Sequence, residues 1–307
     1  MQSLLNLKVK NLQDHQIVDW AYTEEDTPIT LESYREWIEK GLHGPLGYLS
    51  DHRKDLRSSI SSFYPEFQSA LVFLFDYTAA AKSNIEKKDY KFAAYTKGFD
   101  GVDYHHWIRA RLDEIKESLE IDNCTFSIDA QPVLERDLAF RAGLGWFGKN
   151  SMLINKTHGS YFLISSILLD KKLNLDKKGI EADHCGSCTR CVEACPTDAI
   201  LGSRSIDAAK CISTFTIEQF KEVDPPAGYP TDRGEIFGCD ICQDVCPWNN
   251  KPLLRSEVGD TAVFEKKIKG LDLTSISNRE FKRIFKGTSL ERTGRVGILK
   301  NLKHLKR

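Results

Sequence analysis

Cysteine spacing constrains this chain of 307 residues more than any other feature of its sequence. Eight of the nine cysteines fall into two groups, and each group ends in a Cys-Pro pair. The first group has the spacing Cys-x2-Cys-x2-Cys-x3-Cys-Pro and consists of Cys185, Cys188, Cys191 and Cys195. The second group has one distant member followed by Cys-x2-Cys-x3-Cys-Pro and consists of Cys211, Cys239, Cys242 and Cys246. Because such short spacings bring thiols together in one loop, both groups are expected to bind metal.

The order of these spacings is typical of a domain that holds two [4Fe–4S] clusters. In such domains a short loop supplies three thiolates of one cluster, and the cysteine before proline binds the other cluster. This rule assigns cluster one to Cys185, Cys188, Cys191 and Cys246. It assigns cluster two to Cys195, Cys211, Cys239 and Cys242. Tetrahedral zinc is the alternative, but the repeated Cys-x3-Cys-Pro exceeds what a zinc site requires.

The other cysteine and the composition bear on where the protein works. Cys124 lies in an apolar, strand-like segment and is expected to be a small buried side chain. Disulfides are not expected, because the N-terminus lacks an apolar signal segment. Apolar residues make up 41% of the chain and charged residues 28%, and no run approaches the ~20 apolar residues of a membrane helix. We therefore expect a cytoplasmic protein with reduced thiols and no membrane association.

Strand-like and helix-like segments intermingle up to about residue 170, which predicts a layered α+β domain. An apolar run predicts a buried strand at 69–77, and a stripe of apolar residues predicts an amphipathic helix at 103–120. The polar, charged segment 173–183 is typical of a linker. The predicted domains are therefore 1–177, the cysteine-rich 178–255 and the basic, helical 256–307.

One glycine motif requires caution. Gly143, Gly145 and Gly148 form a GxGxxG pattern. A dinucleotide-binding fingerprint must follow a strand and open a helix, whereas this pattern follows the helix-like segment 134–142. We therefore expect a loop in which two pieces of backbone approach closely, rather than a dinucleotide site.

The charge is distributed unevenly along the chain. Residues 278–307 contain ten lysines and arginines but two acidic residues, although the whole chain carries a formal charge of −1. An acidic body with a basic end favours a polyanionic partner at that end. A solvated helical tail is the alternative. The candidate phosphate contacts are Lys300, Lys303, Lys306 and Arg307.

Several segments together resemble the epoxyqueuosine reductases, the cobalamin-dependent enzymes that complete queuosine in tRNA. The segments are GPLGY at 44–48, RKDLR at 53–57, DYHH at 103–106, ID at 128–129, ER at 135–136, RAGLGWFGKN at 141–150, GSY at 159–161 and both cysteine groups. The resemblance covers nearly the whole chain. It departs from the family at Leu56, where proline is usual, and longer members carry helical repeats beyond the segment that ends this chain. A smaller tRNA-binding surface is therefore expected.

The resemblance implies a nitroreductase-like α/β domain that holds cobalamin near one cluster, then a two-cluster ferredoxin-like domain and a short C-terminal helical segment. It points to Asp129 as general acid, because an epoxide oxygen leaves more readily when it is protonated. Arginine binds phosphate groups well, although a surface ion pair is the alternative for each arginine considered. The expected contacts to cobalamin are Arg53, Tyr104, His105, His106, Asp129, Arg136, Lys149, Asn150 and Leu153.

The expected activity is reduction of epoxyqueuosine to queuosine at the wobble position of tRNA, by a monomer. Electrons would come from a ferredoxin- or flavodoxin-type donor and pass through cluster two to cluster one and then to cobalt. Two alternatives remain. A reductive dehalogenase also combines cobalamin with two clusters, but those enzymes commonly carry an export signal. A ferredoxin-type electron carrier fused to a structural domain would need neither a pocket nor a basic segment.

Overall fold

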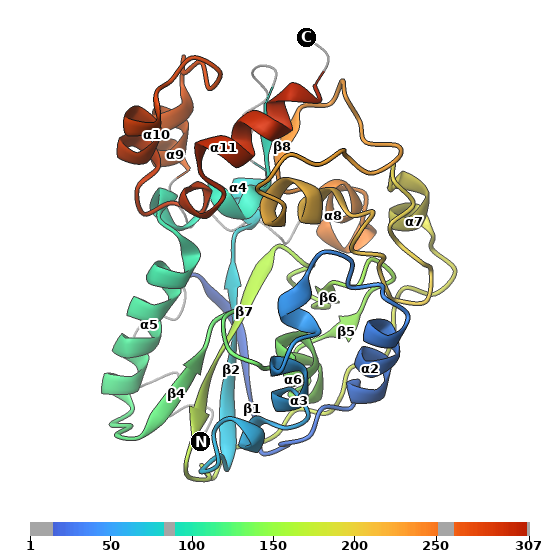
Figure 1. The fold of residues 1–307 in the computed structure, drawn as a ribbon. Helices are drawn as coiled ribbons and strands as arrows, with labels where there is room; N and C mark the ends of the chain where they lie inside the picture. The colour runs from blue at the N-terminus through green and yellow to red at the C-terminus, as the bar shows by residue number, and fades with distance from the viewer. Residues whose placement is uncertain (1–14, 83–89, 251–260, 306–307) are drawn as a thin grey trace.

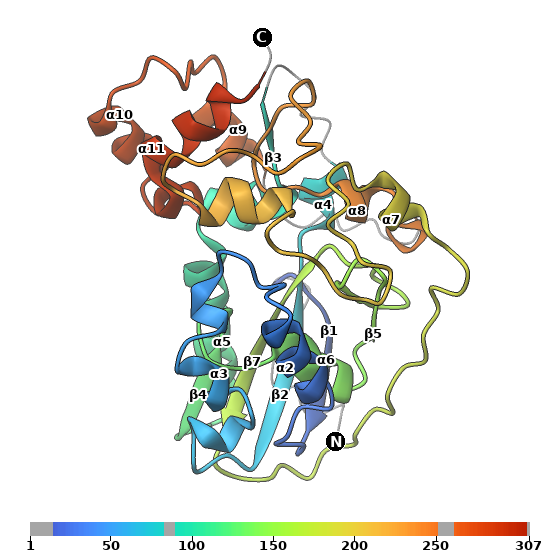
Figure 2. The same cartoon turned by 45° about the vertical axis from the view of Figure 1, so that its right-hand side comes forward.

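The computed structural model describes residues 15–82, 90–250 and 261–305. The molecule has two halves: a lower half built around a sheet, and an upper half that contains the cysteine-rich region and the last helices (Figure 1). Figure 2 shows the coil that follows the last strand of the sheet running along the outside of the molecule to the upper half. No helix in the described part of the chain is long and apolar enough to cross a membrane.

The lower half contains a four-stranded antiparallel sheet with the strand order β1-β2-β7-β4. Its strands are β1 (Ile17–Thr23), β2 (Ser69–Asp76), β4 (Cys124–Ser127) and β7 (Phe162–Leu169). Every residue of β2 is buried, and successive side chains along a strand point to opposite faces. Both faces of this strand must therefore be covered by other elements.

Two helices cover these faces. Helix α5 (Tyr104–Ser118) packs on the face that carries Phe73, and helix α6 (Glu135–Arg141) packs on the face that carries Leu74. The strand predicted at 69–77 and the amphipathic helix that follows it are thereby confirmed, and the lower half is layered. Helices α2 (Leu31–Glu39) and α3 (Arg53–Leu56) also belong to the lower half, whereas α4 (Thr78–Lys82), which follows β2, lies beside the cysteine-rich region in the upper half (Figure 1). Short 3₁₀ turns occur at Gly47–Leu49, Ile60–Ser62, Ala94–Thr96 and Phe99–Gly101.

The glycine motif forms a tight connection between α6 and a small hairpin. The hairpin strands are β5 (Trp146–Phe147) and β6 (Leu153–Ile154). Gly145 lies so close to this hairpin that a Cβ there would be 2.2 Å from the carbonyl oxygen of Ile154. Close backbone approach is therefore confirmed. The motif leads into a strand rather than a helix, as expected for a segment that is not a dinucleotide fingerprint.

The cysteine-rich region forms a strand pair with a segment from the first third of the sequence. Strand β3 (Lys91–Phe92), which precedes α5, forms a parallel pair with β8 (Glu235–Phe237). The other elements of the region are α7 (Arg190–Ala194), the π-helix η5 (Thr214–Glu218), α8 (Ile241–Asp244) and the 3₁₀ turn Pro247–Asn249. The boundaries proposed at residues 177 and 255 stay predictions, and the second falls outside the described residues.

A buried polar network also joins the two halves. The Ser160 hydroxyl donates to Gln243 (2.9 Å) and accepts from the Asn249 side chain (3.0 Å), while the Ser160 amide donates to the Asn249 side chain (2.7 Å). Next to it, the Tyr161 hydroxyl donates to Asp244 (2.6 Å). Because buried polar groups are costly when unpaired, these bonds fix the cysteine-rich region against the end of β7.

Three helices follow the cysteine-rich region: α9 (Ala262–Ile268), α10 (Asn278–Phe285) and α11 (Leu290–Lys303). Helix α10 begins with a capping box in which Ser277 and Glu280 each bond the other's backbone amide. Gly294 has φ 63° and bends α11 near its start. Apolar side chains of all three helices pack together with β8 in one core, so the last helices belong to the upper half.

Candidate active site and cluster ligands

The four cysteines assigned to cluster one surround a single cavity. Its volume is about 280 Å³, and its lining includes Cys185, Cys188, Cys191 and Cys246. Trp248 and Ile154 provide apolar walls. Burial raises the pKa of Cys191 and of Cys246, and neighbouring thiols add to the rise in each case. Four thiols around one cavity fit a cluster, because iron binding takes up the thiolates and displaces their protons.

Three of the four cysteines assigned to cluster two are also neighbours. Burial raises the pKa of Cys239 to about 12, and Cys211 contributes to the rise. Burial likewise raises the pKa of Cys242 well above its usual value, with contributions from both of these thiols. Cys195 accepts a hydrogen bond from the Ala199 amide (3.4 Å), and its part in cluster two stays a prediction.

Cys124 belongs to neither cysteine group. Cys124 is half-buried in β4 and packs against the α5-side core, so it is less buried than expected. Among the described residues, no three His, Cys, Asp or Glu side chains surround one point closely enough to hold a single metal ion. The thiols of cluster one instead line an open space.

Asp129 is an exposed carboxylate at the end of β4, and it is held in a strained turn with φ 56°. Its side chain accepts a hydrogen bond from the Tyr104 hydroxyl (2.6 Å). Its amide donates to the Glu135 carboxyl (2.9 Å), which also accepts from the Ser127 hydroxyl (2.5 Å). Left-handed backbone is uncommon for residues other than glycine, although aspartate adopts it more often than most. The surrounding bonds therefore hold this carboxylate in one position at the surface of the site.

Glu135 is the site residue to which the sequence analysis gave no role. Burial and the neighbouring carboxylate of Asp129 raise the pKa of Glu135 to about 8. At neutral pH its carboxyl is therefore mostly protonated, beside a second carboxyl group. The sequence offered two signals, its place in the family-like segment at 135–136 and its position in the first turn of a helix, but neither indicated a role for its carboxyl.

The histidines that open α5 have local partners. The His105 ring stacks on the Tyr104 ring at 4.0 Å between centroids, and its Nδ1 lies 2.8 Å from a carboxylate oxygen of Asp103. His106 is exposed on the first turn. Burial raises the pKa of Tyr104 far above its usual range, so its hydroxyl keeps its proton and donates to Asp129. Tyr104 is thus the member of this group that the structure brings to the candidate acid.

The other predicted cofactor contacts have partners elsewhere in the protein. Arg53 forms an ion pair with Asp51 at 2.6 Å, which matches the alternative considered from sequence. Lys149 donates to two carbonyls in the loop of cluster one, 2.8 and 2.9 Å away, and Asn150 donates to the carbonyl of Cys242 at 3.3 Å. Leu153 is 3% exposed and packs in the α6-side core, so its predicted cofactor contact does not fit the structure.

Arg136 links the candidate acid to the hairpin. Its guanidinium donates to the hydroxyl of Ser151 (2.7 Å) and to the carbonyl of the same residue. The side chain is exposed to solvent, yet removal from bulk water lowers its pKa and the charge of Asp129 opposes that shift. The Arg136 side chain thus reaches solvent while its guanidinium is partly enclosed by protein, as expected for a residue at the base of a cleft.

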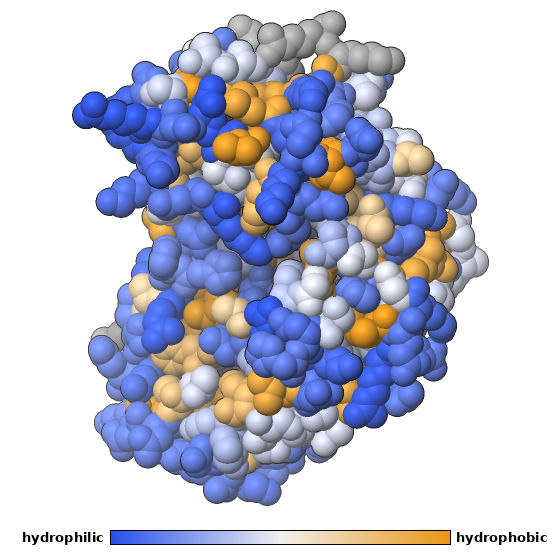
Figure 3. Space-filling view, viewed as in Figure 1, coloured by the Kyte–Doolittle hydropathy of each residue, from blue (hydrophilic) through white to orange (hydrophobic). Residues whose placement is uncertain are grey.

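Residues from distant segments also surround Asp129. Burial raises the pKa of Tyr48 to about 12, with Glu218 and Asp129 adding to the rise. Burial also raises the pKa of Glu218, which pairs with Arg292 at 2.6 Å. Figure 3 shows the surface drawn inward between the two halves of the molecule. Sequence reasoning gave these residues no role, because they come from three separate segments.

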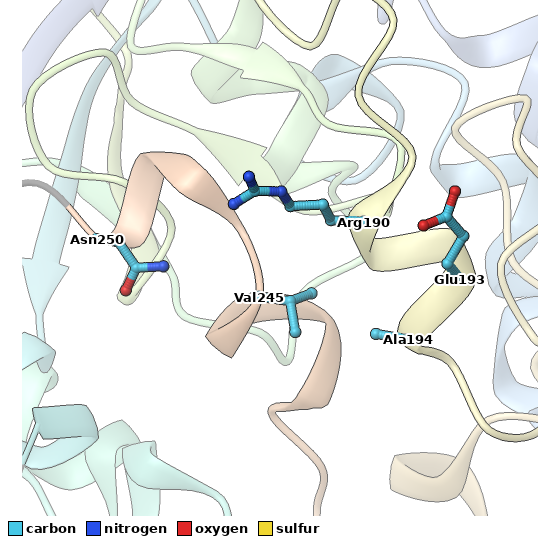
Figure 4. A pocket seen from close by; sticks show the side chains of 5 residues that line it. All are labelled: Arg190, Glu193, Ala194, Val245 and Asn250. Atoms are coloured by element: carbon cyan, nitrogen blue, oxygen red, sulfur yellow. The ribbon is translucent and has the colours of Figure 1, made fainter.

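A second cavity lies on the outer face of the cysteine-rich region. Its volume is about 480 Å³, and it is lined by Arg190, Glu193, Ala194, Val245 and Asn250. Figure 4 shows Arg190 reaching toward Asn250 while Glu193 turns away. The charged groups of this lining do not converge, so the cavity offers no catalytic arrangement.

Comparison with known proteins identifies the family. Residues 57–130 match the family described as "Epoxyqueuosine reductase QueG, DUF1730", and residues 184–249 match "4Fe-4S double cluster binding domain". An epoxyqueuosine reductase from Cyclobacterium marinum is 36% identical over 297 residues, which is 94% of this chain and 91% of that protein. The chain belongs to the epoxyqueuosine reductase family.

Other epoxyqueuosine reductases give the same result. The enzyme of Salmonella typhimurium is 32% identical over 91% of this chain and 73% of its own length. A crystal structure of an epoxyqueuosine reductase with an epoxyqueuosine-modified tRNA-Tyr stem loop superposes with a TM-score of 0.77, at 26% identity, over 99% of this chain and 80% of that chain. The resemblance seen in the sequence is confirmed, as are the mixed α/β fold and the choice of [4Fe–4S] clusters over zinc.

Proposed function

We propose that this chain reduces epoxyqueuosine to queuosine at the wobble position of tRNA. The observation that carries the proposal is the fixed, exposed carboxylate of Asp129 in a member of the epoxyqueuosine reductase family. The test is anaerobic incubation of the full chain with reductant, cobalamin and an epoxyqueuosine-containing stem loop. Mass spectrometry should show loss of one oxygen atom from the modified base. Conversion of a halogenated arene without any conversion of the stem loop would instead favour a reductive dehalogenase.

The reaction requires two electrons and two protons, since the epoxide oxygen leaves as water and an alkene remains. The oxygen is a poor leaving group as an alkoxide, so a proton donor at that atom lowers the barrier. One carboxylate oxygen of Asp129 is occupied by the Tyr104 hydroxyl, which leaves the other free to carry a proton to the substrate. Glu135 holds a proton beside it at neutral pH and can replace the one that Asp129 gives up.

Cobalamin fits the surroundings of Asp129. The corrin ring is broad and flat, with amide and phosphate groups at its edge, and the cleft offers the aromatic Tyr48 and the cationic Arg136 and Arg292. When bound, cobalamin would supply a cobalt centre that accepts electrons singly from a cluster and delivers them to the substrate. We further infer that the lower half is nitroreductase-like, which is supported by its sheet being covered on both faces.

Both clusters have a structural connection to the cleft. Lys149 and Asn150 line the cavity of cluster one, and the next residue of the chain, Ser151, bonds Arg136. On the cluster-two side, Asp240 lies between Cys239 and Cys242 in the sequence. Its carboxylate accepts a hydrogen bond from the backbone amide of Ala94, the residue before Tyr95 (2.6 Å). Burial raises the pKa of Tyr95, and the negative charge of Asp129 adds to the rise. The order of the two clusters in electron transfer, and a ferredoxin- or flavodoxin-type donor, stay predictions.

The pH dependence of folding should report on Glu135. Its pKa is about 8 in the folded chain against an ordinary value of 4.5, so between these values the folded chain keeps a proton that the unfolded chain has lost. The free energy of unfolding should therefore fall as pH rises from about 4.5 to 8. In Glu135→Gln this fall should be smaller, and the variant should be more stable than the wild type at pH 8. Urea unfolding at several pH values measures this pH dependence of the free energy of unfolding.

The matched control is Glu117→Gln, which changes an exposed glutamate on α5 and should keep the wild-type pH dependence. If Glu135→Gln and the wild type lose stability equally between pH 5 and 8, the carboxyl of Glu135 is ionised in the folded protein. The proton supply to Asp129 would then have to come from solvent.

The predicted tRNA contacts at the C-terminus need correction. Lys300 is 3% exposed, and its ammonium group donates to two backbone carbonyls inside the protein, so the prediction that it contacts phosphate is wrong. Lys303 is exposed and pairs with Glu222. Lys306 and Arg307 lie outside the described residues. Charge along the sequence cannot distinguish a buried lysine from an exposed one, which is why the segment appeared uniformly basic.

Helix α10 offers a better phosphate-binding face. Phe281 and Phe285 face the core, and the opposite side is exposed and cationic. The exposed cations are Arg279, Lys282, Arg283 and Lys286. Arg292 on α11 is exposed as well and lies at the cleft beside Glu218. We infer that the tRNA backbone runs over α10 toward the cleft.

Replacing Lys282 and Arg283 with glutamine should weaken binding of the stem loop and make it less dependent on salt. Each phosphate contact contributes roughly 0.7–0.9 to the slope of log affinity against log salt, so the slope should fall by up to about 1.8. Fluorescence anisotropy of a labelled stem loop over a salt series measures both effects. The control is Lys171→Gln, which changes an exposed lysine just after β7. Equal salt slopes for all three proteins would mean that the tRNA does not contact α10.

A further inference from the structure

The π-helix η5 connects the two functional parts of the molecule. It begins three residues after Cys211, which is assigned to cluster two, and it ends at Glu218, whose pKa Asp129 helps to raise. π-Helices are rare and are frequently found at functional sites. Their wider turn displaces backbone carbonyls from regular partners, so such a segment needs hydrogen-bond donors from elsewhere to remain in place.

Helix α11 supplies these donors from its buried side. The Lys300 ammonium donates to the carbonyls of Phe215 (2.5 Å) and Gln219 (2.7 Å). The Asn301 side chain donates to the carbonyls of Thr216 (2.8 Å) and Ile236 (2.7 Å). Both side chains are almost completely buried, at 3% and 0% exposure. Three carbonyls in or next to η5 are therefore held by α11, two of them by Lys300 and one by Asn301.

The same lysine packs on an apolar group that also contacts a ligand assigned to cluster two. Its Nζ is 3.6 Å from the centre of the Phe215 ring, and that ring belongs to a buried apolar group against which Cys239 packs. The buried ammonium and a predicted ligand of cluster two are thus linked through one apolar group. The carboxylate that acts on Lys300, Glu222, is exposed and already pairs with Lys303. Burying an ammonium without a direct carboxylate is costly.

An anionic cluster would offset that cost. Burial lowers the pKa of Lys300 to about 8, so at pH 7 most of the molecules still carry the charge. Four thiolates around an iron–sulfide core form a group of net negative charge, and reduction makes it more negative. A cation fixed behind the cluster stabilises the reduced form more than the oxidised form, because charge and hydrogen bonding set cluster potentials.

We propose that Lys300 is a positioning residue for cluster two, which holds η5 and Cys211 in place and makes the cluster easier to reduce. The proposal rests on the assignment of cluster two within the proposed function. It gives helix α11 a role in electron transfer, and it accounts for a lysine that the protein keeps away from both water and tRNA.

The test compares four variants of the full chain, purified without oxygen. Lys300→Met removes the charge and the donors but keeps the length of the side chain. Lys300→Gln keeps a donor without the charge, and Lys300→Arg keeps both. Lys303→Met is the matched control, since it removes an exposed lysine one turn further along the same helix. Iron content and redox titrations followed by electron paramagnetic resonance report on the clusters without any turnover.

Lys300→Met should lose up to about half of the iron, because one of two four-iron clusters is affected. Lys300→Gln should retain more iron, and its cluster two should be reduced only at a more negative potential. In Lys300→Arg the reduction potential of cluster two should be close to that of the wild type. Lys303→Met should have the wild-type iron content and the wild-type potential. Should Lys300→Met fail to fold, Lys300→Gln alone decides the question.

Wild-type iron content and potential in Lys300→Gln would overturn the proposal. So would a variant in which stem-loop binding weakens while both clusters stay unchanged, because Lys300 would then act on tRNA. A wild-type protein that binds no more iron than a single cluster would refute the cluster assignment itself, and hence the proposed function, whatever the variants show.

Discussion

Replacing Asp129 with asparagine should lower turnover by about 10²–10⁴-fold, the usual contribution of general acid–base catalysis. Asparagine has nearly the same shape and can still accept the bond from Tyr104, but it has no proton to give. Cobalamin binding and stem-loop binding should stay close to those of the wild type. Single-turnover measurements with pre-reduced enzyme are the appropriate readout, because they separate the chemical step from electron supply.

The matched variant for this experiment is Tyr104→Phe. It removes the hydroxyl that orients Asp129 but leaves the acid in place, so its loss of turnover should be smaller. If Asp129→Asn turns over normally with its cofactor bound, the acid lies elsewhere. Tyr104 itself would then be the next candidate, because its hydroxyl keeps its proton at neutral pH.

Replacing single cluster cysteines should abolish turnover and remove about half of the iron, since the double-cluster domain holds two four-iron groups. Cys188→Ser should affect cluster one and Cys242→Ser cluster two. Electron paramagnetic resonance should show that each variant retains the other cluster. Loss of turnover in both is expected, because electrons reach the substrate singly and each cluster is a necessary carrier.

Cys124→Ser is the control for the cluster variants. This thiol lies in β4 and packs against the α5-side core, far along the chain from either cysteine group. Iron content should be unchanged. If Cys124→Ser loses a cluster while Cys188→Ser does not, the sorting of thiols by the Cys-Pro rule is wrong.

The parts of this molecule that could be predicted from sequence are those encoded by local spacing. The four thiols assigned to cluster one line a single cavity, and the assignment could be proposed from sequence because short fixed spacings leave few ways to group them. Strand β2 and helix α5 were also predicted, since a buried strand is apolar throughout and an amphipathic helix has one apolar stripe. Asp129 came from the family resemblance, as no local pattern distinguishes it from other aspartates.

The parts that were missed depend on contacts between distant segments. Tyr48 and Glu218 interact electrostatically with Asp129 only after folding, and Arg292 pairs with Glu218. Lys300 was misjudged for a related reason. A lysine in a polar helix is normally a surface charge, and nothing in the sequence reveals that η5 forms a π-helix whose carbonyls require a buried donor.

The polar network between Ser160, Gln243 and Asn249 has a consequence for how long the protein survives in a cell. These bonds join the end of β7 to the cysteine-rich region, so unravelling of that region exposes buried polar groups at the end of the sheet as well. Clusters are often destroyed by oxygen, and metal binding contributes directly to folding free energy. Aeration should therefore do more than stop catalysis: it should make the entire chain a substrate for proteases, so that protein abundance follows oxygen exposure.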